Sequence, residues 1–437
     1  MMTNFDLIVI GGGPAGSTLA TLVAKAGYDV LIIEKCRFPR YKVGESLLPA
    51  TVTDLFDLLG IDRSNLENLF TLKRGATFSW GSDLNSTWNL NFGGHAANSS
   101  KFSSDTPHAF NVVRSQFDKI LLDNARNKGV CVYDNCKVLR LLETGGVVNG
   151  VEFQNENGVL EKIGAHYVAD ASGQSSKLAS IVGKKTHSKF FKKKAIWGYY
   201  ERSERLPEPL EGNVSFQALD GNWLWHIPLN NTLTSVGVVT SAKQKVKDQH
   251  AYLQQQINSS PLLSKLLKEA ILSTQEPYDS IRICSDYSYC YERFWRPGLV
   301  LVGDSACFVD VLLSSGVHLA TYAGVLSAKS IISILSKELP EVVALNEYET
   351  HVRKEYAIFY DGLIGLYDMS LKSIDYSNWL RRLLSGSNGV FYQAIMNSRI
   401  NGMSNSTANV EAMRAYNKKQ LAYVETASLD TNIITAL

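Results

Sequence analysis

The segment "DLIVIGGGPAGSTLATLVAKAG", residues 6–27, decides the fold. A β-branched run typical of a buried parallel strand leads directly into a glycine-rich turn and then into a helical pattern. Gly11, Gly13 and Gly16 fit the pattern G-x-G-x-x-G, whose glycines allow a tight turn, a close approach to a pyrophosphate and helix–strand packing. The free N–H groups at the start of such a helix favour phosphate. This segment therefore predicts a dinucleotide site.

A second strand supports the same interpretation. The segment "DVLIIE" ends in Glu34, which lies 18 residues after Gly16. A carboxylate at this place can bind the ribose hydroxyls of an adenosine group. A glycine pattern alone is weak, but the order strand, turn, helix, strand and acid favours a nucleotide site over a plain glycine-rich turn.

The composition narrows the function classes. The 437 residues are 45% hydrophobic and 20% charged, which is typical of a globular protein of two or three intertwined domains. The net charge of +2 is too balanced to indicate nucleic-acid binding. We find no apolar run of about 18 residues that would span a membrane, and no signal peptide, so we expect a cytoplasmic protein. The six cysteines form no C-x-x-C pair, which predicts reduced thiols and no metal site.

Two later segments distinguish FAD from NAD. "VADASGQSS" contains Asp170, and "GLVLVGDSACFVD" contains Asp304. An early glycine motif, a middle "DASG" and a late "GD" in this order resemble the FAD-dependent aromatic monooxygenase superfamily. The resemblance runs from about residue 5 to residue 330. It implies that Asp304 contacts the ribityl chain of FAD and that Arg114 corresponds to a flavin-contacting arginine.

Three further segments resemble one branch of that superfamily, the flavin-dependent halogenases. They are "FPRYKVGESLLPA" (38–50), "FTLKRGATFSWG" (70–81) and "WLWHIP" (223–228). The last matches the halogenase pattern W-x-W-x-I-P without a mismatch. The neighbouring segments are most similar to halogenases that act on phenolic tyrosyl or pyrrolyl groups held on carrier proteins.

The resemblance also implies site residues. For the cofactor it implies the glycine turn, the end of the second strand, the Gly-Glu-Ser turn and the later motifs: Gly11, Gly13, Ala15, Gly16, Glu34, Lys35, Gly44, Ser46, Arg114, Asp170, Asp304 and Gly316. For catalysis it implies four residues: Lys73, Trp223, Trp225 and Ser315. Backbone N–H groups at Ser315 and Gly316 would bind the halide.

The implied chemistry explains these residue types. Reduced FAD and O2 give a flavin hydroperoxide, which oxidises chloride or bromide to hypohalous acid, and Lys73 passes the halogen to an electron-rich ring. Lys73 could act as an ammonium that hydrogen-bonds hypohalous acid or as a neutral amine that forms a haloamine; burial would lower its pKa and favour the amine route. Trp223 and Trp225 share one face of a strand, where they would keep the substrate away from the flavin. Simple core packing is the alternative interpretation for either tryptophan.

The segment "CFVDVLLSSGVHLA", residues 307–320, departs from the halogenase pattern at two positions. Val311 stands where the family has proline, and we expect the loop or the halide site to be looser because proline fixes φ. Leu313 stands where tryptophan halogenases have a carboxylate, which argues against free tryptophan as the substrate.

We therefore predict an α/β fold in which a Rossmann-like FAD-binding domain is interleaved with a β-sheet substrate domain and followed by a helical C-terminal region. The predicted FAD module comprises residues 1–80, 107–182 and 290–335. The predicted substrate domain comprises residues 80–107 and 183–290, and the helical region comprises residues 336–437.

Two partners are predicted. No second dinucleotide fingerprint is present, so a separate flavin reductase is expected to supply reduced FAD; the alternative is a single-component hydroxylase that reduces its own FAD with NAD(P)H. The segment 184–194 contains six lysines. Such a run is commonly a solvated surface, but it is also a candidate docking site for an acidic acyl or peptidyl carrier protein. A pyrrolyl-carrier or free-phenol halogenase remains open.

Overall fold

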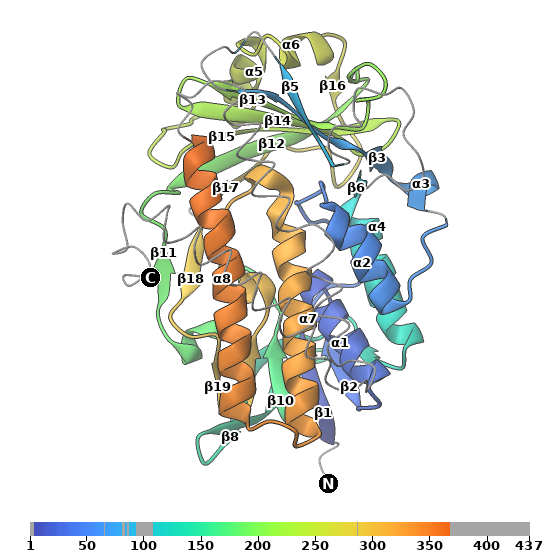
Figure 1. The fold of residues 1–437 in the computed structure, drawn as a ribbon, viewed down its shortest axis with the longest axis vertical. Helices are drawn as coiled ribbons and strands as arrows, with labels where there is room; N and C mark the ends of the chain where they lie inside the picture. The colour runs from blue at the N-terminus through green and yellow to red at the C-terminus, as the bar shows by residue number, and fades with distance from the viewer. Residues whose placement is uncertain are drawn as a thin grey trace, which may run out of the picture.

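The computed structural model describes residues 4–64, 66–80, 84, 87–92, 108–285 and 287–367. These residues build two large sheets, one above the other in Figure 1, with long helices running beside the lower sheet. The predicted fold class is confirmed, because the chain has a nucleotide-binding type of sheet, a second sheet and a helical C-terminal part.

The lower sheet grows from the βαβ unit predicted at the N-terminus. Its strands run in the order β19-β20-β10-β1-β2-β7, with β9 on β10 and β8 on β9. Their bounds are β1 (Asn4–Ile10), β2 (Val30–Ile33), β7 (Cys131–Tyr133), β8 (Lys137–Thr144), β9 (Val147–Gln154), β10 (Leu160–Asp170), β19 (Trp295–Arg296) and β20 (Leu299–Leu301). Strands β1, β10 and β20 are parallel, with Ile10 opposite Asp170 and Asp170 opposite Leu301. The three predicted FAD motifs therefore meet at one edge of the sheet, where such sheets bind ligands.

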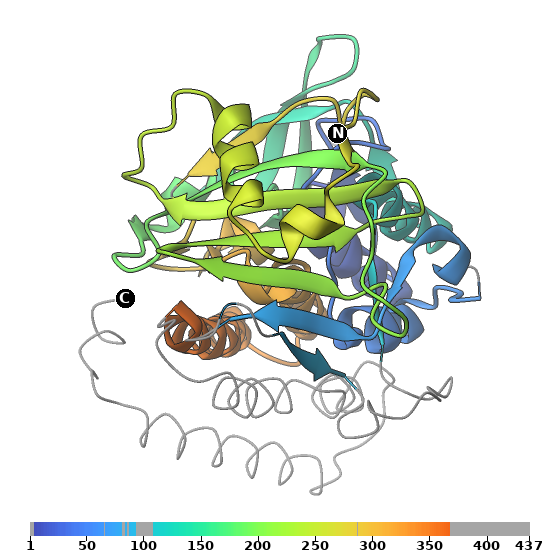
Figure 2. The same cartoon turned by 90° about the horizontal axis from the view of Figure 1, so that it is seen from above.

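The upper sheet carries the two tryptophans on a central strand. Its order is β16-β12-β15-β14-β13-β4-β5, with β17 also on β12. The bounds are β4 (Gly75–Ser79), β5 (Trp88–Asn91), β12 (Lys193–Glu201), β13 (Val214–Leu219), β14 (Asn222–Pro228), β15 (Leu233–Ser241), β16 (Ile271–Leu272) and β17 (Arg282–Ser285). Two short helices, α5 (Gln249–Asn258) and α6 (Leu263–Leu266), lie across its outer face in Figure 2. The opposite face joins the main core.

Two small sheets connect the large ones. Strand β3 (Thr71–Lys73) pairs with β6 (Ala109–Asn111), and β18 (Tyr289–Tyr291) lies between β11 (Lys185–His187) and β21 (Cys307–Phe308). The remaining helices are α1 (Pro14–Lys25), α2 (Pro49–Leu59), α3 (Leu66–Leu69), α4 (Arg114–Asn127), α7 (Ser315–Leu335) and α8 (Glu341–Tyr367), with the short 3-10 helices η2 (Ala179–Val182), η3 (Gly303–Ser305) and η4 (Leu312–Ser314). Helices α7 and α8 run side by side along the molecule (Figure 1).

One sequence expectation needs correction. The segment Leu312–Leu335 is long and apolar enough to span a membrane, although we expected no such run. Of its most apolar 18 residues, 78% are buried inside the molecule, as in the core helix of a folded domain. Gly324 brings it close to α1, because a Cβ there would lie 2.8 Å from the carbonyl oxygen of Ala15. The cytoplasmic location stays a prediction.

The predicted domain limits also stay a prediction. Strands β4 and β5 belong to the upper sheet, while β10 and β20 belong to the lower one, so the chain crosses between the two sheets several times. Helix α8 supplies the start of the predicted helical region. Residues 368–437 of that region lie outside the described residues.

Candidate active site

The glycine turn packs so closely against neighbouring backbone that a side chain would not fit at Gly11 or Gly16. Gly11 has φ +103°, and a Cβ there would lie 2.7 Å from the carbonyl oxygen of Ala171. A Cβ at Gly16 would lie 2.0 Å from the carbonyl oxygen of Gly11. Helix α1 starts after Gly13 without a side-chain cap among the described residues, and Ala15 lies buried in its first turn. Its first N–H groups are therefore available to a pyrophosphate.

The acid at the end of β2 is fixed by the backbone. The Glu34 carboxylate is 4% exposed and accepts hydrogen bonds from the N–H groups of Gly12 (2.8 Å) and Cys36 (3.0 Å). A carboxylate oxygen can accept more than one hydrogen bond, so Glu34 keeps capacity for ribose hydroxyls. Lys35, the next predicted cofactor residue, is exposed.

The two later acids differ in their roles. Asp170 is fully buried and accepts hydrogen bonds from the N–H (2.9 Å) and hydroxyl (2.6 Å) of Ser172 and from the Ser176 hydroxyl, so it shapes its own loop. Asp304 stands in η3. Burial raises the pKa of Asp304, and the nearby cations Lys42 and Arg114 oppose that rise. Asp304 is thus the acid that faces positive charge.

A buried ion-pair cluster lies next to the glycine turn. Asp118 is fully buried and pairs with Arg114 (Nε–Oδ1 2.8 Å) and with Arg40 (Nη1–Oδ2 3.0 Å). Burial lowers the pKa of Arg114, but Asp118 outweighs this effect and raises it. A Cβ at Gly13 would lie 3.3 Å from Nη2 of Arg40. The guanidinium groups of Arg40 and Arg114 are therefore candidate donors to a pyrophosphate, while the carboxylates of Glu45 and Asp304 also lie near Arg114.

One short segment, residues 43–47, joins this cluster to the predicted catalytic lysine. Arg114 Nη1 donates to the carbonyls of Val43 (2.7 Å) and Gly44 (3.2 Å). Gly44 has φ +106°, and a Cβ there would lie 2.9 Å from the same nitrogen, so any other residue at this position would be strained and would displace Arg114. The Ser46 hydroxyl donates to the side chain of Asn111 (2.9 Å).

Lys73 ends β3 at the far side of this segment. It is 2% exposed, and its Nζ donates to the Leu47 carbonyl (2.9 Å) and lies 3.5 Å from the Ser314 hydroxyl. No described carboxylate forms an ion pair with it. Burial lowers the pKa of Lys73 to about 7. The side chain is therefore an amine that gains and loses its proton near neutral pH, as a group that forms a covalent bond requires.

The predicted halide loop, taken as residues 311–316, has a strained backbone and a hydroxyl without a hydrogen-bond partner among the described residues. Leu313 and Ser314 adopt left-handed conformations, with φ of +69° and +59°, which side-chain-bearing residues rarely adopt. Such strain is concentrated at functional sites. Ser315 starts α7 and is 1% exposed, and its hydroxyl has no hydrogen-bond partner among the described residues. A helix N-terminus beside an unpaired buried hydroxyl suits a small anion such as a halide.

Val311 stands where the family has proline, and a side-chain hydrogen bond spans this position. Val311 has φ −86°, and the carboxylate of the preceding residue, Asp310, accepts a hydrogen bond from the Leu312 N–H at 2.9 Å. Gly316, in the first turn of α7, lies close to the Phe308 ring, because a Cβ at this position would lie 3.2 Å from that ring. Whether the loop is looser than in a proline-containing relative stays a prediction.

The two tryptophans occupy alternate positions on β14, on the same face of the strand, and their ring centroids are 5.9 Å apart. Trp223 is 1% exposed and donates its indole N–H to the Tyr367 hydroxyl (2.8 Å). Trp225 is 5% exposed and donates to the Ser235 hydroxyl (3.2 Å). Their predicted role as a barrier stays open, but only Trp223 is tied to the halide loop, as the next contacts show.

Sequence reasoning missed a polar chain behind the tryptophans. The Tyr367 hydroxyl lies 3.2 Å from both carboxylate oxygens of Asp310. Asp310 is 1% exposed, and burial raises its pKa to about 6 while the Leu312 N–H and Tyr367 oppose that rise. Trp223, Tyr367 and Asp310 thus connect the upper sheet to the residue before the halide loop. Arg40 was missed too, although it stands in the quoted segment 38–50.

These features can be compared with known proteins. The chain matches the tryptophan halogenase family over residues 6–104 and 94–387. This protein belongs to that family of flavin-dependent halogenases. It is 32% identical to a tryptophan 2-halogenase of Chondromyces crocatus over 398 residues, which cover 89% of this chain and 73% of that protein. A 1H-pyrrole-2-carbonyl-[peptidyl-carrier protein] chlorinase of Pseudomonas fluorescens is 28% identical over 84% of both chains.

The halogenase fold is also found by structural similarity. The myxobacterial chondrochloren halogenase CndH, a variant of the FAD-dependent halogenases, is 38% identical, with a TM-score of 0.81, and the match covers 99% of this chain and 92% of that one. Family membership confirms an oxidoreductase that uses reduced FAD, O2 and a halide. The chain's own residues fit these groups, because the glycine turn, the arginine pair and the unpaired Ser315 hydroxyl offer matching sites.

Proposed function

We propose that this halogenase chlorinates or brominates a tyrosyl or other phenolic ring held on a peptidyl carrier protein, with Lys73 delivering the halogen. The observation that carries the proposal is the position of Lys73, which is buried, has no ion pair with any residue that the structure describes, and lies 3.5 Å from the Ser314 hydroxyl of the halide loop. Bound FAD, once reduced, would pass two electrons to O2. The partly reduced oxygen would then take two more electrons from the halide, which becomes hypohalous acid.

The surroundings of Lys73 determine the direction and the protonation of its amine. The Leu47 carbonyl accepts from Nζ of Lys73 and fixes its direction, so the amine stays next to the halide loop. Its lowered pKa leaves a large neutral fraction at pH 7. A neutral amine can attack the halogen of hypohalous acid; the oxygen–halogen bond breaks, the leaving hydroxide takes a proton from the nitrogen and becomes water, and the halogen is held as a haloamine. The halogen then remains electrophilic and is delivered from one fixed atom.

Trp223 and Trp225 support the separation of substrate from flavin. Both rings are buried, rigid and held by a hydrogen bond from the indole N–H. A small oxidant can pass such a barrier where an aromatic substrate cannot.

The carrier-bound substrate rests on three observations. Leu313 provides no carboxylate at the position where tryptophan halogenases have one, although a relative is a tryptophan 2-halogenase. One relative acts on a peptidyl-carrier protein. The segment 184–194 keeps Lys184, Lys189 and Lys192 exposed, around the 46% exposed ring of Phe190. A basic surface with an apolar centre suits an acidic carrier protein.

Not all six lysines of that segment are available for docking. Nζ of Lys185 lies 3.6 Å from the ring centre of Tyr289, and Nζ of Lys193 lies 4.5 Å from that of Tyr367. Nζ of Lys194 donates to the Gln244 carbonyl. The proposed docking residues are therefore the three exposed lysines alone.

The deciding experiment compares substrates. Purified enzyme receives FAD, a flavin reductase, NADH, O2 and chloride or bromide, with tyrosyl-loaded carrier, pyrrolyl-loaded carrier, free tyrosine or a free phenol. A halogen mass shift on the tyrosyl carrier supports the proposal. Faster conversion of the pyrrolyl carrier would mean that the substrate ring is a pyrrole and not a phenol. Efficient conversion of free tyrosine or a free phenol would contradict a carrier-bound substrate. Rapid reduction of bound FAD by NADH without the reductase would favour the single-component alternative.

The docking surface has a matched control. Replacing Lys184, Lys189 and Lys192 by Glu should raise KM for the carrier by at least about tenfold at low salt and leave conversion of a soluble surrogate unchanged. The control variant carries the same charge change at three other exposed positions, Lys128, Lys137 and Lys268. Equal effects of the two variants would contradict a specific docking site.

A further inference from the structure

Two thiols face each other close to the turn that carries Asp304. Cys290 on β18 and Cys307 on β21 are directly opposite in an antiparallel pair, and they are 4% and 7% exposed. The Tyr291 N–H donates to the Ala306 carbonyl, so the neighbouring residue pair is the hydrogen-bonded one. The cysteines therefore occupy the alternate position, where the side chains of facing residues lie closest.

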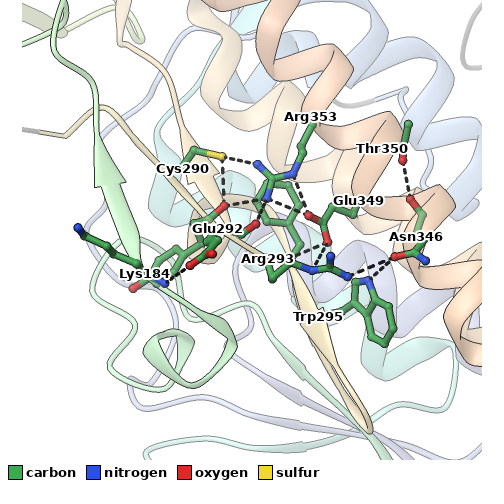
Figure 3. A network of polar contacts seen from close by, with 11 residues as sticks. Lys184, Cys290, Glu292, Arg293, Trp295, Asn346, Glu349, Thr350 and Arg353 are labelled. Carbon is green, nitrogen blue, oxygen red and sulfur yellow. Dashed lines mark hydrogen bonds and ion pairs between the residues drawn. The ribbon is translucent and has the colours of Figure 1, made fainter. Parts of the chain in front are cut away.

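An arginine on α8 points at one of these sulfurs. Nη1 of Arg353 donates to Sγ of Cys290 at 3.1 Å, as Figure 3 shows. The guanidinium is fixed by Glu349 (2.9 Å) and by the carbonyls of Tyr291 (2.8 Å) and Glu292 (2.7 Å). It cannot turn away without losing these bonds. A fixed cation beside a sulfur favours the thiolate over the thiol.

The two thiols differ in protonation. The hydrogen bond from the Cys307 thiol and the Arg353 guanidinium lower the pKa of Cys290. The same hydrogen bond and burial raise the pKa of Cys307 well above its ordinary value. The Cys290 thiol donates to the Tyr291 carbonyl at 3.5 Å, and its lowered pKa makes it the thiol of the pair that loses its proton first. This is the arrangement of a reactive cysteine and its resolving partner.

We propose that Cys290 and Cys307 form a peroxide-reactive pair that removes hydrogen peroxide released at the flavin site. The oxidant arises when reduced flavin passes two electrons to O2 without oxidising a halide. The Cys290 thiolate attacks one peroxide oxygen, breaks the O–O bond and becomes a sulfenic acid, while the leaving hydroxide takes a proton and forms water. The Cys307 thiol then attacks that sulfur, forms the disulfide and releases a second water. One peroxide is reduced to two waters, and two thiols lose two electrons.

The position of the pair fits this role. The Tyr289 hydroxyl, on the residue before Cys290, donates to the Asp304 carbonyl. Cys307 follows Ser305, the last residue of η3, by two positions. Both sulfurs therefore belong to strands that contact the predicted flavin turn directly. Neither residue has a part in the proposed halogen transfer.

The test treats the full-length, FAD-loaded enzyme with one equivalent of hydrogen peroxide, blocks free thiols and maps the peptides by mass spectrometry. We expect a Cys290–Cys307 disulfide that dithiothreitol reverses. Cys290 should react at least about tenfold faster than Cys36 or Cys131, which are more exposed, because reactivity follows thiolate character. Equal rates at the three cysteines, or a product that does not join Cys290 to Cys307, would overturn the proposal.

Three variants separate the roles of the residues. Cys307→Ser should stop the reaction at a Cys290 sulfenic acid that dimedone labels, and Arg353→Gln should slow oxidation of Cys290. If Arg353→Gln does not fold, Cys290→Ser replaces it and should abolish the reversible loss of peroxide, whereas the matched variant Cys131→Ser should not. Unchanged peroxide consumption by Cys290→Ser would contradict the proposal. Turnover with the reductase but without halide should produce the same disulfide.

Discussion

Two buried cations, Arg114 and Lys73, lie at opposite ends of the segment 43–47, and their surroundings differ. Arg114 is 7% exposed and forms an ion pair with the buried carboxylate of Asp118. Lys73 is 2% exposed and donates to the Leu47 carbonyl, with no ion pair among the described residues. The pKa of the arginine is raised, whereas that of the lysine is lowered to about 7.

This difference shows how one protein uses buried charge in two ways. A paired guanidinium stays charged, and removing its partner would leave an isolated charge in the interior, so we expect Arg114 to stabilise the fold and to remain a cation beside the predicted cofactor site. An unpaired buried amine is unfavourable for folding, because burial opposes its charged form. It is useful only where chemistry needs a group that exchanges a proton near neutral pH. The comparison therefore supports the proposals that Arg114 stabilises the fold and that Lys73 is the reactive group.

The largest expected effect comes from Lys73→Met, which removes the amine and keeps a chain of similar length. Halogenated product should fall by more than about 10⁴-fold, because a covalent halogen carrier is lost rather than one proton-transfer group. Oxidation of reduced flavin should continue at the wild-type rate, and thermal stability should be equal or higher. Mass spectrometry of the product beside stopped-flow flavin absorbance measures both. A variant that halogenates at near wild-type rate would show that Lys73 is not the carrier.

The second expected effect lies at the other end of the segment. Asp118→Asn leaves Arg114 and Arg40 without their shared carboxylate, and we expect a loss of about 3–5 kcal/mol of unfolding free energy and weaker FAD binding. The control is Asp123→Asn on the same helix, where an exposed carboxylate pairs with Lys119 and Arg126. That change should lower stability by less than about 1 kcal/mol. Urea unfolding and FAD titration measure both; equal losses would remove the distinction between buried and exposed pairs.

The third expected effect is the pH dependence of stability. Between about pH 7 and the ordinary lysine pKa, the unfolded chain holds a proton at residue 73 that the folded chain does not, so the free energy of unfolding rises with pH. Below that range both states are protonated and the full penalty of the buried charge remains. Relative to Lys73→Met, the wild type should therefore gain about 3 kcal/mol from pH 7 to 9.5. If the difference in unfolding free energy between the wild type and Lys73→Met stays the same at every pH, then Lys73 is either exposed or paired with an acid in solution.

The sequence predicted the parts of this molecule whose cause is local. The strand, glycine turn and helix of residues 6–27 follow from backbone and periodicity rules, and the structure has β1 and α1 there. The position of Lys73 came from its flanking motif. Its burial and its lowered pKa needed the structure, because they depend on neighbours such as Leu47 and Ser314.

The missed contacts join residues far apart in the chain. Arg40 meets Asp118 across 78 positions, and Tyr367 meets Asp310 across 57. Cys290 and Cys307 lie only 17 positions apart, yet their pairing depends on a strand register that no sequence pattern gives. Single-sequence rules describe what each segment favours, whereas a site is made by segments that the fold brings together.

The smallest expected effect tests whether the two cations act independently. A Cβ at Gly44 would lie 2.9 Å from Nη1 of Arg114 at a φ of +106°, whereas Gly60, with φ +70°, would meet only the flexible end of Lys128 at 3.4 Å. Gly60→Ala should therefore cost about 1–2 kcal/mol of stability through its backbone conformation alone. Gly44→Ala should cost about 1 kcal/mol more and weaken FAD binding, since Arg114 has to move.

The other end of the segment should not respond to Gly44→Ala. The Leu47 N–H is held separately by the Phe110 carbonyl (3.0 Å), and the Ser46 hydroxyl is held by Asn111, so the acceptor for Lys73 is anchored apart from the arginine. At saturating FAD, the pH dependence of product formation should then match that of the wild type, with an apparent pKa near 7. A shift of that pKa in Gly44→Ala, but not in Gly60→Ala, would mean that the segment transmits changes from the flavin side to the lysine. The two buried cations would then have to be treated as one coupled site.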